Sequence, residues 1–421
     1  MEFMKTPVKG MCDILPDEMR LREYVISMIK ETYELYGFSQ IETPVVEHIE
    51  NLTGKQGGEN EKLMFQIMKR GEELKKAFQE GKEELADLGL RYDLTVPLAR
   101  YYANNMNKLT MPFKAMQLGN VFRADKPQKG RFRQFMQCDI DILGDNTILA
   151  EIELIAATSA MLTNIFKEVG ITEFTIHIND RQILKAIGAY AGFCEAEFDE
   201  VFISLDKMDK IGAEKVKEEL LLKGYSVEKV SKFISVFDNP YIDISCAEFC
   251  EFLTKGFIDT QVIKNLDTII TSVKNMINKN VKLVYNPTLV RGMSYYTGTI
   301  FEIGIEGYNF SIAGGGRYDE MIGKFSGQSI AACGFSIGFE RIVTILKDYA
   351  KENNFSIKKR LAILIDKNMS AEKTIDILKE ATVLRKSGTI VLVQPLNKNV
   401  KYQVENLERE GYTEIRKVYT S

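Results

Sequence analysis

Apolar and polar residues alternate strongly over residues 119–144, where two strand-like ends flank a turn-like centre. Residues 134–143 follow period 2, which predicts a β-strand. Pro127 and Gly130 lie between the two ends, and both residue types favour a turn between antiparallel strands. Successive side chains of a strand point to opposite faces, so Gln137, Asp139 and Asp141 are expected on one face.

The pattern elsewhere predicts a chain of mixed strands and helices. A spacing near 3.6 residues indicates helices over 18–36 and 147–169 and a largely helical stretch from 180 to 279. Residues 69–88 fit a solvated surface helix or hairpin. Strands are expected at 38–46, 63–67 and 173–178, and Pro44 assigns the first of them to an edge or an interface.

The last part of the chain changes pattern after residue 359. Strands are expected at 361–365, 389–393 and 415–419, with helices at 370–386 and 398–410. This strand–helix alternation predicts a small domain built on a parallel sheet.

Composition narrows the class of protein. With 421 residues, of which 45% are hydrophobic and 27% charged, the chain can form two or three soluble domains. Its net charge of −4 provides no global basic field, so any contact with RNA must rely on local patches. We expect no membrane span and no signal peptide. The six cysteines form no CxxC pair, which favours a cytosolic protein without a zinc site.

Basic and aromatic residues gather around the turn of the 119–144 hairpin. The cations are Arg123, Lys126, Lys129, Arg131 and Arg133. Arginine matches phosphate oxygens with a planar fork of donors, and the nearby Phe135 offers a flat apolar face to a purine. Together with the acidic far strand, this pattern suits a nucleotide and an amine-bearing second substrate. The structural alternative is a solvated hairpin whose charges protect a sheet edge from aggregation.

The same residues resemble a known family. Residues 122–125 (Phe-Arg-Ala-Asp), 130–135 (Gly-Arg-Phe-Arg-Gln-Phe) and 137–141 (Gln-Cys-Asp-Ile-Asp) resemble motif 2 of histidyl-tRNA synthetase, a class II aminoacyl-tRNA synthetase. The helix at 18–36 with the following strand is similar to motif 1, which builds the dimer interface in class II enzymes. Residues 289–302 and 313–319 resemble two histidine-specific motifs, and residues 332–341 resemble motif 3.

The resemblance implies histidine activation by ATP, with Mg²⁺ bridging the phosphates, and transfer of the histidyl group to tRNA(His) by a homodimer. It implies catalytic roles for Arg291 and Arg123. The implied histidine-binding residues are Asp93, Leu94, Thr95, Gln137, Asp141, Tyr295, Tyr296 and Tyr318. The implied ATP-binding residues are Arg123, Asp125, Arg131, Phe135 and Arg341.

The expected fold is α+β, a class II antiparallel sheet with flanking helices. We expect a catalytic core at 1–179 and 280–350, a helical insertion at 180–279, and a shortened α/β domain at 359–421 that resembles the family's anticodon-binding domain. Two features depart from the family: Ser294 replaces the usual Asp, and the last domain ends early. The early end favours an alternative, the synthetase-like regulatory subunit of ATP phosphoribosyltransferase. A paralogue that activates histidine for another acceptor also stays open.

Overall fold

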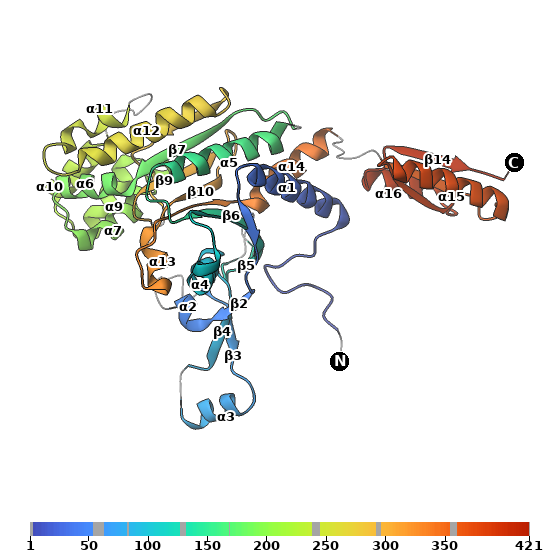
Figure 1. Cartoon of the computed structure of the whole chain (residues 1–421), viewed down its shortest axis with the longest axis horizontal. Helices are drawn as coiled ribbons and strands as arrows, with labels where there is room; N and C mark the ends of the chain where they lie inside the picture. The colour runs from blue at the N-terminus through green and yellow to red at the C-terminus, as the bar shows by residue number, and fades with distance from the viewer. Residues whose placement is uncertain are drawn as a thin grey trace. The chain divides into compact units, whose positions relative to one another are not determined.

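The computed structural model describes residues 3–53, 63–81, 84–126, 132–167, 169–237, 245–291, 296–353 and 360–420. The backbone forms two compact units (Figure 1). The first contains Met1–Cys12 and Met28–Arg341, and the second contains Asp13–Ser27 and Ile342–Ser421. Each unit is described by itself below.

An eight-stranded sheet forms the centre of the first unit. Its strands in spatial order are β1 (Ser39–Ile41), β5 (Phe113–Phe122), β6 (Gln134–Leu143), β11 (Ala332–Ile337), β10 (Ser311–Arg317), β9 (Thr299–Gly304), β7 (Phe174–Asp180) and β8 (Val281–Tyr285). All neighbours from β5 to β7 are antiparallel, whereas the outermost pairs, β1 with β5 and β7 with β8, are parallel. This sheet with its flanking helices confirms the predicted α+β fold and the predicted hairpin of β5 and β6.

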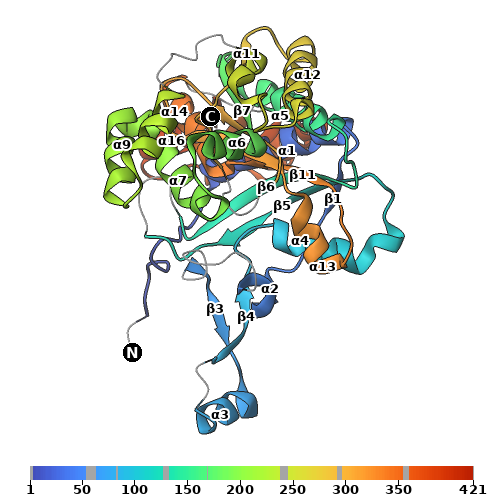
Figure 2. The ribbon, with the colours of Figure 1, turned by 90° about the vertical axis from the view of Figure 1, so that its left-hand side faces the viewer.

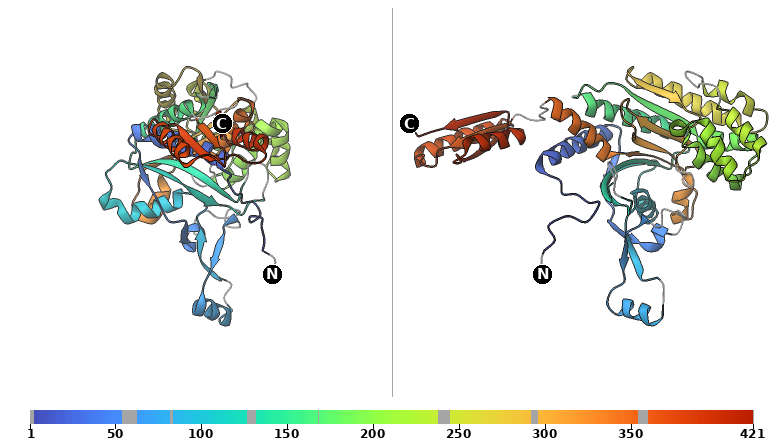
Figure 3. Two further views of the ribbon diagram at one scale, coloured as in Figure 1. Left: turned by 90° about the vertical axis from the view of Figure 1, so that its right-hand side faces the viewer. Right: turned by 180° about the vertical axis from the view of Figure 1, so that it is seen from behind.

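Two sets of helices cover the two faces of this sheet (Figures 1 and 3). One face carries α5 (Leu149–Lys167), which packs on β6 and β11 and against α12 (Thr260–Met276). The second half of α1 (Pro16–Leu35) joins this layer, because the Tyr33 hydroxyl lies 3.2 Å from the Thr158 hydroxyl of α5. By length and composition α5 is the one described helix that could cross a membrane, but 72% of its apolar 18-residue window is buried inside the protein, as in an ordinary core helix.

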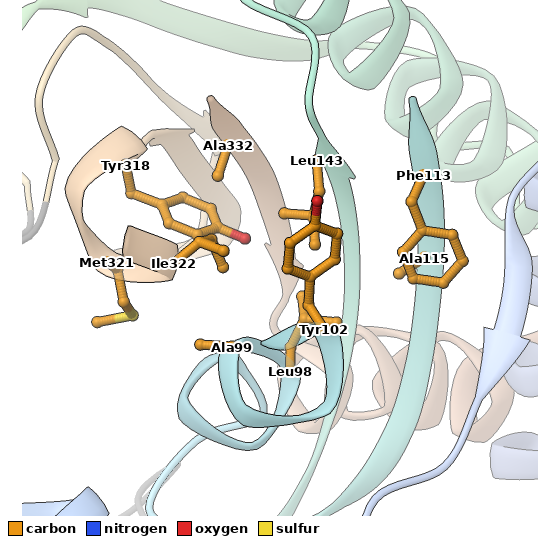
Figure 4. Close-up of a cluster of buried hydrophobic side chains, with 10 residues drawn as sticks. All are labelled: Leu98, Ala99, Tyr102, Phe113, Ala115, Leu143, Tyr318, Met321, Ile322 and Ala332. Atoms are coloured by element: carbon orange, nitrogen blue, oxygen red, sulfur yellow. The ribbon is translucent and has the colours of Figure 1, made fainter. Parts of the chain in front are cut away.

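The opposite face is bordered by α4 (Thr95–Asn105) and α13 (Asp319–Ser326). Figure 4 shows apolar side chains of these two helices packed together beside the ends of β5 and β6. The cluster contains Leu98, Ala99, Tyr102, Phe113, Ala115, Leu143, Tyr318, Met321, Ile322 and Ala332. Tyr318 is fully buried in this cluster, which fixes the position of its ring.

A second, smaller sheet follows the break at Pro44. It has the order β2 (Val46–His48), β4 (Ala86–Leu90) and β3 (Gln66–Met68), with α2 (Ile49–Thr53) next to β2 in the chain. The helix α3 (Gly71–Gln79) lies beyond the far ends of β3 and β4 (Figure 2). The strand predicted at 38–46 is therefore two strands, and Pro44 separates β1 in the large sheet from β2 in the small one. The strand predicted at 63–67 begins only at Gln66.

Between β7 and β8 the described residues form helices and connecting turns. The α-helices are α6 (Arg181–Ala191), α7 (Phe198–Leu205), α8 (Met208–Ile211), α9 (Ala213–Leu222), α10 (Val227–Ser235), α11 (Cys246–Cys250) and α12. The sulfur atoms of Cys246 and Cys250 lie 3.8 Å apart in the buried interior, as expected for packing residues on one helical face. The treatment of this stretch as a separate domain remains our proposal.

The second unit contains a three-stranded parallel sheet, as the sequence predicts. Its strands are β12 (Arg360–Ile365), β13 (Ile390–Pro395) and β14 (Glu414–Val418), with β12 in the centre. Alternate residues of β12 pack on opposite sides, Leu361 and Ile363 with α15 (Ala371–Lys386), and Ala362 and Leu364 with α16 (Val400–Arg409). The helix α14 (Phe339–Asn353) precedes this sheet in the chain.

Candidate active site

A row of polar residues and glycine crosses the face of the large sheet that α4 and α13 border. The register aligns one residue from each of six neighbouring strands. In order they are Gln117, Asp139, Ser336, Gly314, Glu302 and His177. The next row on this face contains Asp141 beside Gly334. The sheet thus brings together residues that are more than 200 positions apart in the chain.

Glycines allow side chains to lie flat on this face. A Cβ atom at Gly314 would stand 1.8 Å from Nη1 of Arg291, and one at Gly334 would stand 2.1 Å from Oδ1 of Asp141. Both distances are far shorter than any contact between non-bonded atoms, so a side chain at either position would clash. Gly314, in the glycine-rich segment 313–319, therefore makes room for the side chain of the protein's own Arg291.

Arg291 is held by an acidic side chain of the sheet. Its Nη1 donates to Oε2 of Glu302 at 2.6 Å, and both side chains are partly exposed. Arg291 does not lie in a strand, although its apolar and aromatic neighbours in the sequence suit one. It lies in the irregular segment after β8, because the turn around Asn286 and Thr288 ends the strand, and β9 starts only at Thr299.

Arg123 follows the last residue of β5 and lies between two aromatic rings. Its guanidinium carbon is 4.3 Å from the centre of the Tyr92 ring and 5.1 Å from that of Phe135, and its Nε donates to the Tyr92 carbonyl at 3.1 Å. Contacts of this kind hold an arginine in one orientation while leaving part of its donor fork for a ligand. The backbone of Asp125 is also fixed, because its carbonyl accepts from Nε of Arg133 at 3.1 Å.

The start of α14 lies next to the start of β6. The backbone N–H of Met136 donates to Oε1 of Glu340 at 3.0 Å. Beside it in the chain, Arg341 donates through Nη1 to the Ser311 carbonyl, with its guanidinium 5.5 Å from the centre of the Phe310 ring. Phe135 and Arg341 are thus positioned by adjoining elements. Arg131 lies outside the described residues.

Asp93 caps α4 as well as facing the site. Its Oδ1 accepts from the backbone N–H groups of Thr95 at 3.1 Å and Val96 at 3.0 Å, which satisfies two of the helix's unpaired donors. Leu94 is fully buried, and its carbonyl accepts from Nε2 of Gln117 at 3.1 Å. The side chain of Leu94 therefore belongs to the core.

The acidic strand β6 places Asp139 and Asp141 in the protein interior. Burial raises the pKa of Asp139 to about 7, with a further increase from the charge of Asp93 and decreases from the Ser336 hydrogen bond and the charge of Arg123. Burial, together with the charge of Asp139, holds the pKa of Asp141 well above its usual value, although a hydrogen bond from Tyr318 opposes this. Two buried carboxyl groups on one face create a strong preference for a cationic ligand.

Two buried oxygen atoms on β6 have no hydrogen-bond partner among the described residues. They are Oδ2 of Asp141 and Oε1 of Gln137. Buried polar atoms are normally paired, so each is a candidate acceptor for a ligand. Tyr296 lies nearby, against Gly316, and burial raises the pKa of its hydroxyl to about 12. Tyr295 and Ser294 lie outside the described residues.

Three residues at the site were not assigned a role from the sequence. Asp139 was expected on the same face as Gln137 and Asp141, and this alternation was the only signal for it. Glu302 ends the segment that resembles the first histidine-specific motif, and Ser336 lies within the segment that resembles motif 3. Nothing in the sequence pairs Glu302 with Arg291 or Ser336 with Asp139. The first contact depends on the path of an irregular segment after β8, and the second depends on the register between β6 and β11.

Comparisons with known proteins agree on one family. The family model described as "Histidyl-tRNA synthetase" matches residues 10–342. A histidine–tRNA ligase from Leifsonia xyli subsp. xyli is 44% identical over 81% of this chain and 80% of its own length. A probable histidine–tRNA ligase from Tropheryma whipplei is 38% identical over 96% of this chain and 94% of its own.

Solved structures extend the likeness to the fold. The histidyl-tRNA synthetase from Nostoc sp. PCC 7120 is 30% identical, with a TM-score of 0.77 over 97% of this chain and 90% of that one. An ATP phosphoribosyltransferase regulatory subunit/histidyl-tRNA synthetase from Bacillus halodurans C has a TM-score of 0.75 over both whole chains, but at 22% identity it shows the fold alone. The chain belongs to the histidyl-tRNA synthetase family.

Proposed function

We propose that this protein is a histidine–tRNA ligase, which activates histidine with ATP and transfers the histidyl group to tRNA(His). The observation that carries the proposal is the buried acidic strand β6. Its unpaired oxygens on Gln137 and Asp141 lie on the sheet face that also holds Arg291. Acceptors for an amine and an imidazole therefore lie beside a cation suited to a phosphate.

In the proposed first step, a carboxylate oxygen of histidine bonds to the α-phosphorus of ATP in line with the leaving group. The bond from that phosphorus to pyrophosphate breaks, and histidyl-adenylate forms. No protein group makes a covalent bond, so positioning and stabilisation of charge supply the rate enhancement. Arg123 and Arg291 would hold the α-phosphate, and their existing contacts with Tyr92, Phe135 and Glu302 limit the reorganisation needed.

The rest of ATP would be bound at the edge of the same face. Phe135 would stack on adenine, Asp125 would lie near its amino group, and Arg131 and Arg341 would bind the terminal phosphates. Mg²⁺ would arrive with ATP and neutralise charge on the phosphates. No group of three or more His, Cys, Asp or Glu side chains suited to a metal ion occurs in the described part of the chain.

The site would recognise the histidine substrate at its α-ammonium group and at its imidazole ring. The α-ammonium group would meet Asp93, with Thr95 beside it, and the imidazole would meet Asp141, which Tyr318 orients, and Tyr296. A pocket that hydrogen-bonds its substrate rejects analogues that lack the partner atoms, because its own polar groups are left unpaired. We further propose that the protein is a cytoplasmic homodimer. Tyr295 would contribute to the pocket, and Leu94 would support it from the core.

The test has two stages. Histidine-dependent exchange of pyrophosphate into ATP is expected from the first step, and charging of tRNA(His) from the second. Exchange without charging would favour a paralogue with another acceptor. Neither activity, in a folded protein, would reject the proposal and favour the regulatory-subunit alternative.

A further inference from the structure

Three residues on two neighbouring strands form a directional chain of hydrogen bonds. Nε2 of Gln137 on β6 lies 3.0 Å from the Ser336 hydroxyl on β11 and 3.4 Å from Oδ2 of Asp139. The Ser336 hydroxyl donates to Oδ1 of Asp139 at 2.6 Å. Asp139 is buried, and the two strands are paired at this point by direct register between Ser336 and Asp139.

The chemistry of these groups decides which way the Gln137 amide points. An ionised carboxylate only accepts hydrogen bonds, so Ser336 gives its proton to Asp139 and offers its own lone pairs to Gln137. Both neighbours of the amide are then acceptors, and only its NH₂ group can face them. The opposite atom, Oε1, is buried and has no hydrogen-bond partner among the described residues. It is left as an acceptor for a ligand.

We propose that Asp139 and Ser336 are positioning residues, which fix the Gln137 amide so that its oxygen faces the α-ammonium group of the amino-acid substrate. This inference rests on the proposed function. An ammonium group donates three hydrogen bonds and carries a full charge, which strengthens each of them. If the amide were reversed, its NH₂ group would meet the ammonium group, and two donors would repel each other. The orientation therefore selects an amine over a neutral hydroxyl.

Asp139→Asn is the variant that changes this orientation. The new amide can donate to the oxygen of Gln137 and so stabilise the reversed amide. The measurement is kcat/KM in pyrophosphate exchange for histidine, divided by that for its α-hydroxy analogue, imidazolelactate. Assays at pH 8 keep Asp139 ionised, above its pKa of about 7. We expect this ratio to fall at least about tenfold, or roughly 1.4 kcal/mol. Ser336→Ala, which removes only one link, should lower the ratio at least about threefold.

A rescue variant tests whether the ratio falls because the Gln137 amide reverses or because the site is damaged in another way. The double variant Gln137→Glu/Asp139→Asn keeps the total charge and presents an oxygen whichever way its carboxylate turns. It should restore the ratio to within about threefold of the wild type. The matched control is Asp180→Asn, which neutralises another buried carboxyl group but keeps a good cap at the start of α6, and its ratio should not change.

The outcomes separate a failure of this inference from a failure of the proposed function. A normal wild type with an unchanged ratio in both single variants would overturn the inference alone. So would a ratio in the double variant no better than in Asp139→Asn. A folded wild type without histidine-dependent exchange would overturn the proposed function, and this inference with it.

Discussion

At the scale of single residues, burial of charged groups on one sheet face costs stability that a cationic substrate can offset. Asp139 and Asp141 lie close enough for the charge of Asp139 to raise the pKa of Asp141. The charge of Asp93 raises the pKa of both carboxyl groups. Such arrangements concentrate at functional sites, where a ligand supplies the missing partner. The opposite charge on Arg291 is paired with Glu302.

Arg291→Ala is expected to lower the rate of pyrophosphate exchange about 10²–10³-fold, or roughly 3–4 kcal/mol, because a preorganised donor at the developing charge is lost. The melting temperature should stay close to that of the wild type, since Arg291 is partly exposed. Arg416→Ala is the control, because it also removes an arginine from an ion pair with a glutamate, Glu380, but in the second unit. A rate within about threefold of wild type would remove Arg291 from the catalytic residues.

Asp141→Ala tests the recognition of imidazole. The buried carboxylate has one oxygen bonded by Tyr318 and one without a partner in the described part of the chain. We expect the KM for histidine to rise at least about tenfold, or roughly 1.4 kcal/mol, with a far smaller change for ATP. Equal changes in both constants, or none, would show that Asp141 does not read the imidazole.

The buried carboxyl group of Asp180 predicts a dependence of stability on pH. Burial raises its pKa from 3.8 to about 7, so the folded protein holds this proton more tightly than the unfolded chain. Its contribution to stability is complete below about pH 4 and is lost as the pH rises through 7. Between pH 6 and pH 8, the melting temperature of Asp180→Asn should therefore fall less than that of the wild type, by about 1–2 °C. Glu306→Gln, at an exposed carboxylate, should behave as the wild type; equal losses in all three proteins would contradict the argument.

At the scale of elements, adjacent glycines of β10 have different tasks. A Cβ at Gly314 meets the end of the flexible Arg291 side chain, whereas one at Gly315 stands 2.0 Å from the backbone oxygen of Gly334. Gly314→Ala should therefore fold with a melting temperature near that of wild type but lose most exchange activity, since it displaces Arg291. Gly315→Ala should lower the melting temperature because a backbone must move. Full activity in Gly314→Ala would show that the position of Arg291 on the sheet is unimportant.

Periodicity predicted the elements of this protein better than their partners. The strand β6 and the elements of the second unit match the expected ranges closely, because each has a clear period and strong turn signals. The strand β5 starts at Phe113, before the expected stretch of residues 119–144. The segment around Arg291 did not match, since its sequence pattern fits a strand whereas Arg291 itself lies in an irregular connection after β8. The chain of Gln137, Ser336 and Asp139 could not be predicted, because it depends on a register between segments about 200 residues apart.

At the scale of the whole molecule, the sequence predicted the class of fold because its local patterns and its resemblance to a family agreed. It placed the strand that contains Pro44 at an edge or an interface but could not decide between the two. The structure shows that Pro44 separates two sheets and leaves β1 as a three-residue edge strand, paired only with β5 in the described chain. Exposed apolar side chains, Leu35 and Val45, lie on either side of this strand in the sequence.

The last prediction is that the protein is a homodimer that uses this edge. An open strand flanked by exposed apolar residues is a template for association, and a symmetric pair of such edges closes the assembly. The wild type should sediment as a dimer at micromolar concentration. Val45→Lys should shift the mass toward the monomer and lower exchange activity together, because a buried lysine in each copy would lack a partner. Val383→Lys is the control, since Val383 is also exposed but lies on α15 in the second unit. A wild type that is monomeric and fully active would contradict the prediction, and dissociation in both variants would place the interface elsewhere.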